Sequence, residues 1–177
     1  MLFLLFGSTI NIPQLKIDFG QSKDGQNWNV INDGVMGGLS QGQAQLSENG
    51  LLFKGKVSLA NNGGFASFKG PFEPTDLSDF ETVKIRLRST GCQFAMTLEM
   101  YERFYYPYFK HPLQTSGSGE WEILELKLSD FKAYQMGRLV GTKLTDKEKK
   151  EIIRLGVITN EKREIPFELE IDYISFE

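Results

Sequence analysis

Two glycine-rich segments hold the side chains whose types and spacing are best suited to binding chemistry. Residues 28–42 read WNVINDGVMGGLSQG, and residues 61–67 read NNGGFAS. Glycine adopts positive φ or lets another backbone approach closely, and an aspartate in a tight turn accepts hydrogen bonds from nearby amides. The first segment is therefore either a loop held in place by Asp33 or a loop that also presents Asp33, Met36 and Ser40 to a ligand or partner.

The second segment is not a phosphate-binding loop, because it lacks the Lys-Ser/Thr pair and a following helical pattern. Asn61 and Asn62 tolerate a left-handed backbone and hydrogen-bond to it, so the segment is either a turn between strands or a pair of ligand contacts. Loops on a rigid scaffold are favoured binding sites, and the two segments could converge at one end of the fold.

Arg86 and Arg88 are candidate charged contacts, since they alternate with apolar residues and share one face of a strand. A solvated outer face is the simplest interpretation. On a concave face the two guanidinium groups could instead pair with carboxylates such as Glu99, or bind an acidic group of a partner.

The densest aromatic segment is residues 104–109, which read FYYPYF. Such side chains combine a large contact area with a polar tip, as sugar-stacking sites and protein hot spots both require. Tyr105, Tyr106 and Tyr108 are therefore candidate binding residues. The alternative is an aromatic strand divided between the core and a sheet edge.

Residues that support catalysis or metal binding are scarce. One cysteine, Cys92, and one histidine, His111, exclude a Cys/His zinc site, and no nucleophile motif surrounds the histidine. The sequence identifies no carboxylate pair spaced for glycoside hydrolysis. We therefore expect a non-catalytic protein without a cofactor.

A structural calcium ion is the remaining metal to consider. Asp18, Glu168 and Asp172, near the ends of the chain, could contribute oxygen ligands, but no loop has calcium-ligand spacing. We accordingly expect no metal site.

Charge and composition exclude further classes. Twenty Lys and Arg against 23 Asp and Glu give a net charge of −3, which leaves no excess positive charge for a nucleic acid backbone. The 177 residues are 40% hydrophobic and 24% charged, as in one globular domain rather than a disordered or multi-span membrane chain.

The N-terminal residues 1–6 read MLFLLF, a run too short to cross a bilayer. We expect residues 1–16 to be an apolar tail or edge segment and residues 17–177 to be a single domain. The alternative for residues 1–6 is the remnant of a secretory signal. The expected location is cytoplasmic, with membrane association only through a partner, or secreted or periplasmic if the remnant interpretation holds.

Apolar residues recur with period two, which predicts strands with one buried face. The pattern covers residues 51–59, 83–88, 94–100, 124–128 and 167–173. Gly and Pro clusters separate these segments, so we predict a two-sheet antiparallel sandwich. Trp28, Phe65 and Trp121 are expected to pack between the sheets. Thr145 and Glu148 form a capping box and Gly156 a stop signal, which predict one short helix over residues 145–155.

The two glycine-rich segments, in this order after Trp28, resemble the complex I intermediate-associated protein family. Its hallmark is a Trp, an Asp-Gly-Val-Met-Gly-Gly-x-Ser element and an Asn-x-Gly-Gly-Phe-x-Ser element. The resemblance extends from about residue 17 to about residue 176. It also includes residues 84–88, 105–109, 119–121, 137–138, 155–157 and 167–174.

The resemblance implies a galactose-binding-like β-jelly roll and the role of an assembly factor, a chaperone for respiratory complex I. It implies a protein partner such as a respiratory-complex assembly intermediate. No transit peptide is recognisable, so we expect a bacterial-type, stand-alone member.

The alternative function is a carbohydrate-binding module that uses Tyr101, Tyr105, Tyr106 and Tyr108. A sugar-binding site should show exposed aromatic rings beside convergent polar groups in a groove. A protein-binding site should show a broader patch with an apolar centre and a polar rim.

Overall fold

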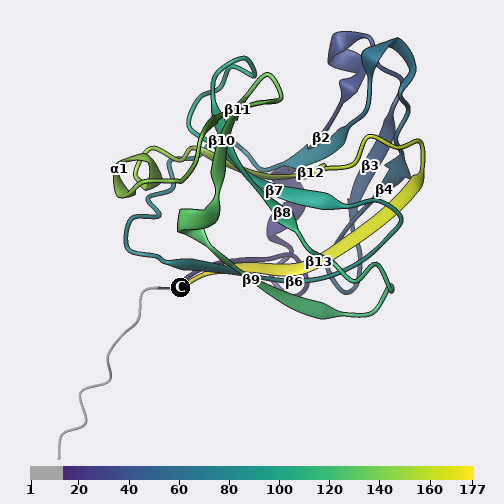
Figure 1. Cartoon of the computed structure of the whole chain (residues 1–177). Helices are drawn as coiled ribbons and strands as arrows, with labels where there is room; N and C mark the ends of the chain where they lie inside the picture. The colour runs from purple at the N-terminus through teal and green to yellow at the C-terminus, as the bar shows by residue number, and fades with distance from the viewer. Residues whose placement is uncertain (1–13) are drawn as a thin grey trace, which may run out of the picture.

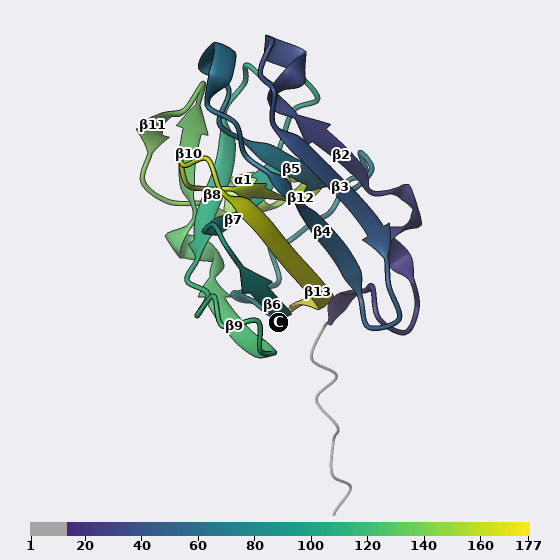
Figure 2. The same ribbon diagram turned by 90° about the vertical axis from the view of Figure 1, so that its right-hand side faces the viewer.

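Two antiparallel sheets face each other in this computed structural model, which describes residues 14–177 (Figure 1). The apolar residues 1–6 and most of the expected tail lie outside the described residues. The strands of one sheet follow one another across the view in Figure 2, in the order β3, β4, β13, β6 and β9.

The six-stranded sheet has its central strand, β13, paired with β6 on one side and with both β4 and β1 on the other. Its strands are β1 (Leu15–Asp18), β3 (Gln41–Leu46), β4 (Leu51–Lys56), β6 (Thr82–Thr90), β9 (Glu122–Lys127) and β13 (Pro166–Phe176). On the side away from β6, the six-residue β4 pairs with the first half of the 11-residue β13, and β1 pairs with its end.

The seven-stranded sheet has the order β11-β10-β8-β7-β12-β5-β2. Its strands are β2 (Asn29–Asn32), β5 (Ala66–Lys69), β7 (Phe94–Glu99), β8 (Tyr108–Leu113), β10 (Lys132–Gln135), β11 (Arg138–Gly141) and β12 (Arg154–Thr159). Short 3-10 turns connect strands of the two sheets: η1 (Asp24–Asn27), η2 (Asp33–Met36), η3 (Ala60–Asn62) and η4 (Leu128–Asp130).

The core lies between the sheets, where the period-two apolar side chains meet. Phe53 of β4 contacts Phe68 of β5 and Phe167 of β13, with ring centroids 4.9 Å apart in both pairs. Trp28 packs edge-on against Phe19 at 5.0 Å and borders the same cluster, as predicted. The contact between Phe53 and Phe68 joins one sheet to the other, and the two antiparallel sheets confirm the predicted all-β sandwich.

Strand β7 departs from the predicted pattern of one buried face. Its alternate residues Ala95 and Thr97 are buried together with Phe94, Met96 and Leu98. The strand lies in the middle of its sheet, and aromatic side chains from the segment that follows it extend over the outer face near Thr97. Both faces of the strand are therefore covered.

The single helix, α1 (Asp146–Lys149), is shorter than predicted. Its start is correct, because Thr145 and Glu148 form the capping box. The prediction of helix beyond Lys149 was wrong, and Gly156 belongs to β12 rather than to a helix end. The backbone of Ile153 instead donates to the Glu99 carbonyl at 2.8 Å and accepts from Glu73 at 2.7 Å, so extended pairing replaces the helical hydrogen bonds.

We predict that Phe53→Ala lowers the free energy of unfolding by about 3–5 kcal/mol, because it removes a buried ring from between the sheets. Ile123→Ala, an exposed position on the edge strand β9, should change it by less than about 0.5 kcal/mol. Urea denaturation of both variants measures the difference. Equal losses would show that Phe53 does not join the sheets as described.

Candidate functional site

The two glycine-rich segments meet at the buried carboxylate of Asp33, which is 1% exposed. Its Oδ1 accepts a hydrogen bond from the Ser40 amide at 2.9 Å. Its Oδ2 accepts from the Ser40 hydroxyl at 2.5 Å and from the amides of Gly64 and Phe65 at 2.7 and 3.2 Å. The expected convergence of the segments is therefore present, and Asp33 locks both.

Burial opposes ionisation of the Asp33 carboxyl, but the hydrogen bonds from Ser40, Gly64 and Phe65 outweigh it. The pKa of Asp33 is consequently lowered from its ordinary value, and the group is a carboxylate at neutral pH. Charge-assisted hydrogen bonds of this kind are stronger than neutral ones.

The side chains of Asp33 and Ser40 belong to this buried hydrogen-bond network, so both stabilise the fold. Asn61 and Asn62 are exposed and have φ of 54° and 59°, as expected for an asparagine turn. The side chain of Met36 lies outside the described part of the chain. A ligand contact by any of these five residues stays a prediction.

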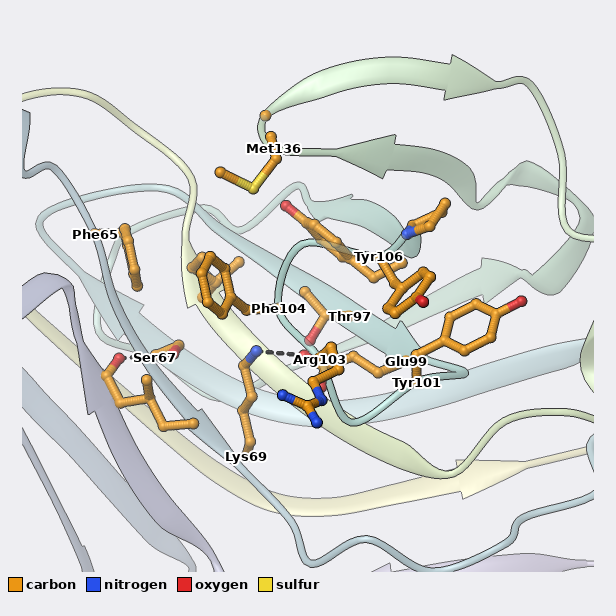
Figure 3. A pocket seen from close by; sticks show the side chains of 15 residues that line it. Phe65, Ser67, Lys69, Thr97, Glu99, Tyr101, Arg103, Phe104, Tyr106 and Met136 are labelled. Carbon is orange, nitrogen blue, oxygen red and sulfur yellow. Dashed lines mark hydrogen bonds and ion pairs between the residues drawn. The ribbon is translucent and has the colours of Figure 1, made fainter. Parts of the chain in front are cut away.

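A cleft of about 320 Å³ lies on the outer face of the seven-stranded sheet (Figure 3). Lys69, Thr97 and Tyr108 line it, whereas their neighbours Phe68, Met96 and Phe109 are buried in the core. Side chains of a strand alternate between faces, so the lining comes from the face opposite the core. Strands β2, β5, β7, β8 and β12 all contribute to it.

The walls of the cleft come from two connections. Residues 101, 103, 104, 106 and 107 belong to the segment from β7 to β8, and Met136 and Gly137 form the turn between β10 and β11. Met136 and Gly137 have φ of 47° and 77°, as a tight two-residue hairpin turn requires. Figure 3 shows Met136 on the far side of the cleft from Lys69.

An ion pair between Lys69 and Glu99 lies on the floor of the cleft. The side chains are 19% and 12% exposed, so the pair is largely shielded from water. Arg154 approaches the other oxygen of Glu99 at 3.9 Å. Beside the pair, Thr97 is 2% exposed, and its Oγ1 has no hydrogen-bond partner among residues 14–177.

Burial raises the pKa of the Tyr108 phenol, and the charge of Glu99 and the neighbouring Tyr134 add to the effect. Tyr108 is therefore a neutral phenol at physiological pH and can donate a hydrogen bond. Tyr106 also lines the cleft, and Tyr105 stacks on it at the rim with ring centroids 5.0 Å apart. Of the predicted tyrosines, Tyr101, Tyr106 and Tyr108 thus line the cleft, and Tyr105 packs against Tyr106.

Arg86 and Arg88 lie elsewhere, on the outer face of the six-stranded sheet. Arg86 pairs with Asp172 at 2.6 Å and Arg88 with Glu170 at 2.5 Å, and both guanidinium groups stack on Trp121 at 4.5 and 4.9 Å. These contacts satisfy both cations within the protein. Whether they also bind a partner stays a prediction.

One alternative and two expectations about these side chains were wrong. Glu99 pairs with Lys69 rather than with Arg86 or Arg88, because it belongs to the other sheet. Trp121 covers the two arginines instead of packing between the sheets. Phe65 is only partly buried and lines the cleft rather than filling the core.

The cleft also contains Lys69, Thr97 and Arg103, which were not predicted as site residues. The alternation in residues 94–100 placed Thr97 and Glu99 on the face away from the core, which was a usable signal. Lys69 lies close to Glu99 only because β5 and β7 both pair with β12, and no local sequence pattern specifies this pairing.

The residues considered for metal binding are engaged in other contacts. Asp18 pairs with Lys16, Asp172 pairs with Arg86, and Glu168 is exposed on β13. Within residues 14–177, no three His, Cys, Asp or Glu side chains are grouped so that they could hold a metal ion. The structure therefore gives no support to a calcium site formed by these residues.

His111 and Cys92 lie apart from the cleft lining. The His111 ring packs on Phe131 at 5.2 Å. Burial, followed by the charge of Glu161, raises the pKa of the Cys92 thiol to about 12, so this buried thiol is unreactive. Among the described residues, no helix has the length and apolar character that a membrane crossing requires.

We predict that Gly38→Ala destabilises the protein by about 1–3 kcal/mol, because the added methyl group would overlap the Asp33 side chain. Gly34→Ala is the matched control, since a methyl group there meets no atom within 4 Å. Thermal unfolding of both variants checks this. Equal melting temperatures would contradict close packing of Gly38 against the Asp33 side chain.

A second prediction concerns pH. The folded pKa of Asp33 lies below its unfolded value of about 3.9, so its contribution to stability is present above that pH and is lost as the pH falls through the folded pKa. The difference in unfolding free energy between the wild type and Asp33→Asn should therefore shrink below about pH 4. Urea titrations at pH 6, 4 and 3 measure it, and a constant difference would refute an ionised Asp33.

Structural comparison supports the jelly-roll fold. A family 11 carbohydrate-binding module of the cellulase Lic26A-Cel5E of Clostridium thermocellum is 12% identical, with a TM-score of 0.64 over 93% of this chain and 94% of that one. The solution structure of CtCBM11 is 10% identical, with a TM-score of 0.53 over 95% and 96%. The agarase AgWH50C is 13% identical, with a TM-score of 0.56 over 91% of this chain and 24% of that one.

Structural similarity at such low sequence identities establishes the fold alone, and it confirms the expected β-jelly roll. No curated protein sequence matches the chain. The sequence profile of the family described as complex I intermediate-associated protein 30 matches residues 17–171, which include both segments joined by Asp33 and most of the two sheets. The chain therefore belongs to the complex I intermediate-associated protein 30 family.

Proposed function

We propose that this protein is a non-catalytic binding module that binds a protein partner on the outer face of its seven-stranded sheet. The partner class follows from the family, whose name describes association with an intermediate of complex I, so an assembly intermediate of a respiratory complex is the first candidate. The observation that carries the proposal is a group of exposed, largely apolar side chains around the cleft. We call it the aromatic patch; its members are Tyr101, Phe104, Tyr105, Tyr106 and Met136.

The side chains of the aromatic patch are between 43% and 71% exposed. The rings of Tyr101 and Tyr106 lie 4.8 Å apart, and Tyr105 contacts both Tyr106 and Phe104, at 5.0 and 5.6 Å. Mutual packing restricts these rings before a partner arrives, so little conformational entropy remains to be lost on binding. Apolar area removed from water would then contribute roughly 25 cal/mol per Å².

Polar residues flank the members of the aromatic patch along the chain. Glu102, Arg103, Gln135 and Arg138 are exposed and adjacent in sequence to patch or cleft residues. An apolar centre with a polar rim is the arrangement expected of a protein-binding surface.

A carbohydrate ligand is the second candidate, and the cleft itself favours it. Exposed aromatic rings stand beside Lys69, Glu99 and Arg103, which converge in one groove. Structures of a family 11 carbohydrate-binding module share the fold, which makes this candidate compatible with the scaffold.

Glycoside hydrolysis is a poorer match to the cleft. The typical mechanism needs two carboxyl groups that flank one bond. Glu99 is the one carboxylate among the described residues that line the cleft, and it is paired with Lys69. This supports a binding role over a catalytic one.

We predict that Phe104→Ala and Tyr106→Ala each weaken partner capture by about 30-fold, the loss typical of an interface hot spot. Both side chains are exposed, so stability should stay within about 0.5 kcal/mol of the wild type. The measurement is affinity capture of the tagged protein from its own cells, with bound proteins quantified by mass spectrometry. Ile123→Ala, exposed on the other sheet, is the control.

Respiratory-complex subunits should be recovered with the wild type and with Ile123→Ala, and lost with the two patch variants. Full capture by folded Phe104→Ala and Tyr106→Ala proteins would remove the aromatic patch as the docking surface. Recovery of glycosylated material in place of respiratory subunits would favour the carbohydrate candidate.

A further inference from the structure

The charges that line the cleft do not cancel. Lys69 and Arg103 are cationic and Glu99 is the one carboxylate among the described lining residues. The cleft therefore carries one excess positive charge on a protein whose net charge is −3. Opposite charge elsewhere on the surface makes this excess a local feature of the cleft.

Arg103 is the unpaired cation. None of the ion pairs formed within residues 14–177 includes it. Residues 1–13 contain no Asp or Glu that could supply a partner. Figure 3 shows Arg103 beside the Lys69–Glu99 pair, and Arg103 is exposed.

Glu99 cannot neutralise Arg103, because two other cations already share it. Lys69 pairs with one of its oxygens, and Arg154 lies 3.9 Å from the other. The side chain of Arg154 is 11% exposed, so its charge acts through poorly screened surroundings. The two cations around Glu99 therefore outweigh its negative charge and add to the positive potential at Arg103.

We propose that the cleft binds a saccharide that carries a carboxylate, and that Arg103 pairs with this carboxylate. The planar guanidinium group matches a carboxylate with two parallel hydrogen bonds, which adds orientation as well as affinity. The proposal rests on the carbohydrate candidate given above and specifies its ligand as acidic.

The other cleft groups suit the remaining parts of a sugar. The exposed rings of Phe104 and Tyr106 offer apolar faces for a pyranose ring, while Lys69 and Tyr108 supply donors for its hydroxyl groups. The cleft volume of about 320 Å³ falls at the lower end of the range for small-ligand sites, about 300–1,000 Å³. One or two sugar rings are the appropriate occupants.

The test is isothermal titration calorimetry of the full chain with tetragalacturonate and tetramannuronate, and with neutral cellotetraose and a tetraglutamate peptide for comparison. We expect at least one uronate to bind, more weakly as the NaCl concentration rises. Arg103→Ala should lower its affinity by at least tenfold, and Tyr106→Ala should also lower it. Arg163→Ala, an exposed arginine paired with Glu161, should leave it unchanged.

Three results would overturn the inference. Uronate binding that is equal in the wild type and in Arg103→Ala would show that the charge is not recognised. Binding of cellotetraose but of neither uronate would refute the acidic ligand while leaving a carbohydrate-binding function intact. Binding of tetraglutamate but of no saccharide would refute the acidic sugar and favour the protein partner.

Discussion

The carboxylate of Asp33 is the constraint on which the binding face depends. It follows directly after β2 and accepts hydrogen bonds from the amides of Gly64 and Phe65, which directly precede β5. The backbone amide of Asp33 in turn donates a hydrogen bond to the Phe65 carbonyl at 3.3 Å. One buried charge thus holds the ends of two adjacent strands in place, and the outer faces of these strands form one side of the cleft.

The two outer faces of the sandwich differ in how their polar groups are satisfied. On the six-stranded sheet, Arg86 and Arg88 are paired with carboxylates of β13 and covered by Trp121. Binding a ligand there would first require breaking charge-assisted contacts, each worth more than a neutral hydrogen bond. On the seven-stranded sheet, Arg103 is unpaired within residues 14–177 and the neighbouring rings are open to water, so a ligand gains contacts without displacing any. This asymmetry supports the proposal that the outer face of the seven-stranded sheet is the binding face.

The fold was predictable from the sequence because its signals are local. Alternation of apolar residues identified the strands, and the Thr145–Glu148 capping box identified the helix start. The helix end was missed because Ile153 is fixed by backbone pairing with residues more than fifty positions away. The cleft was only partly predictable: its tyrosines are conspicuous in the sequence, whereas Lys69 and Glu99 meet through strand pairing. The sequence alone also could not show that Arg86 and Arg88 are satisfied by β13, whose bulge next to Asp172 sets the register.

The conformational cost of the turn at Met136 supports a binding role for the cleft. Its φ of 47° lies in the left-handed region, where a residue other than glycine or asparagine costs about 1 kcal/mol or more. Glycine or asparagine would make the same hairpin turn at lower cost, so turn geometry alone does not account for a methionine. Its flexible apolar side chain is 54% exposed and lines the cleft, where burial could stabilise only a complex. A strained turn that holds an exposed apolar side chain beside the cleft agrees with the proposed binding role.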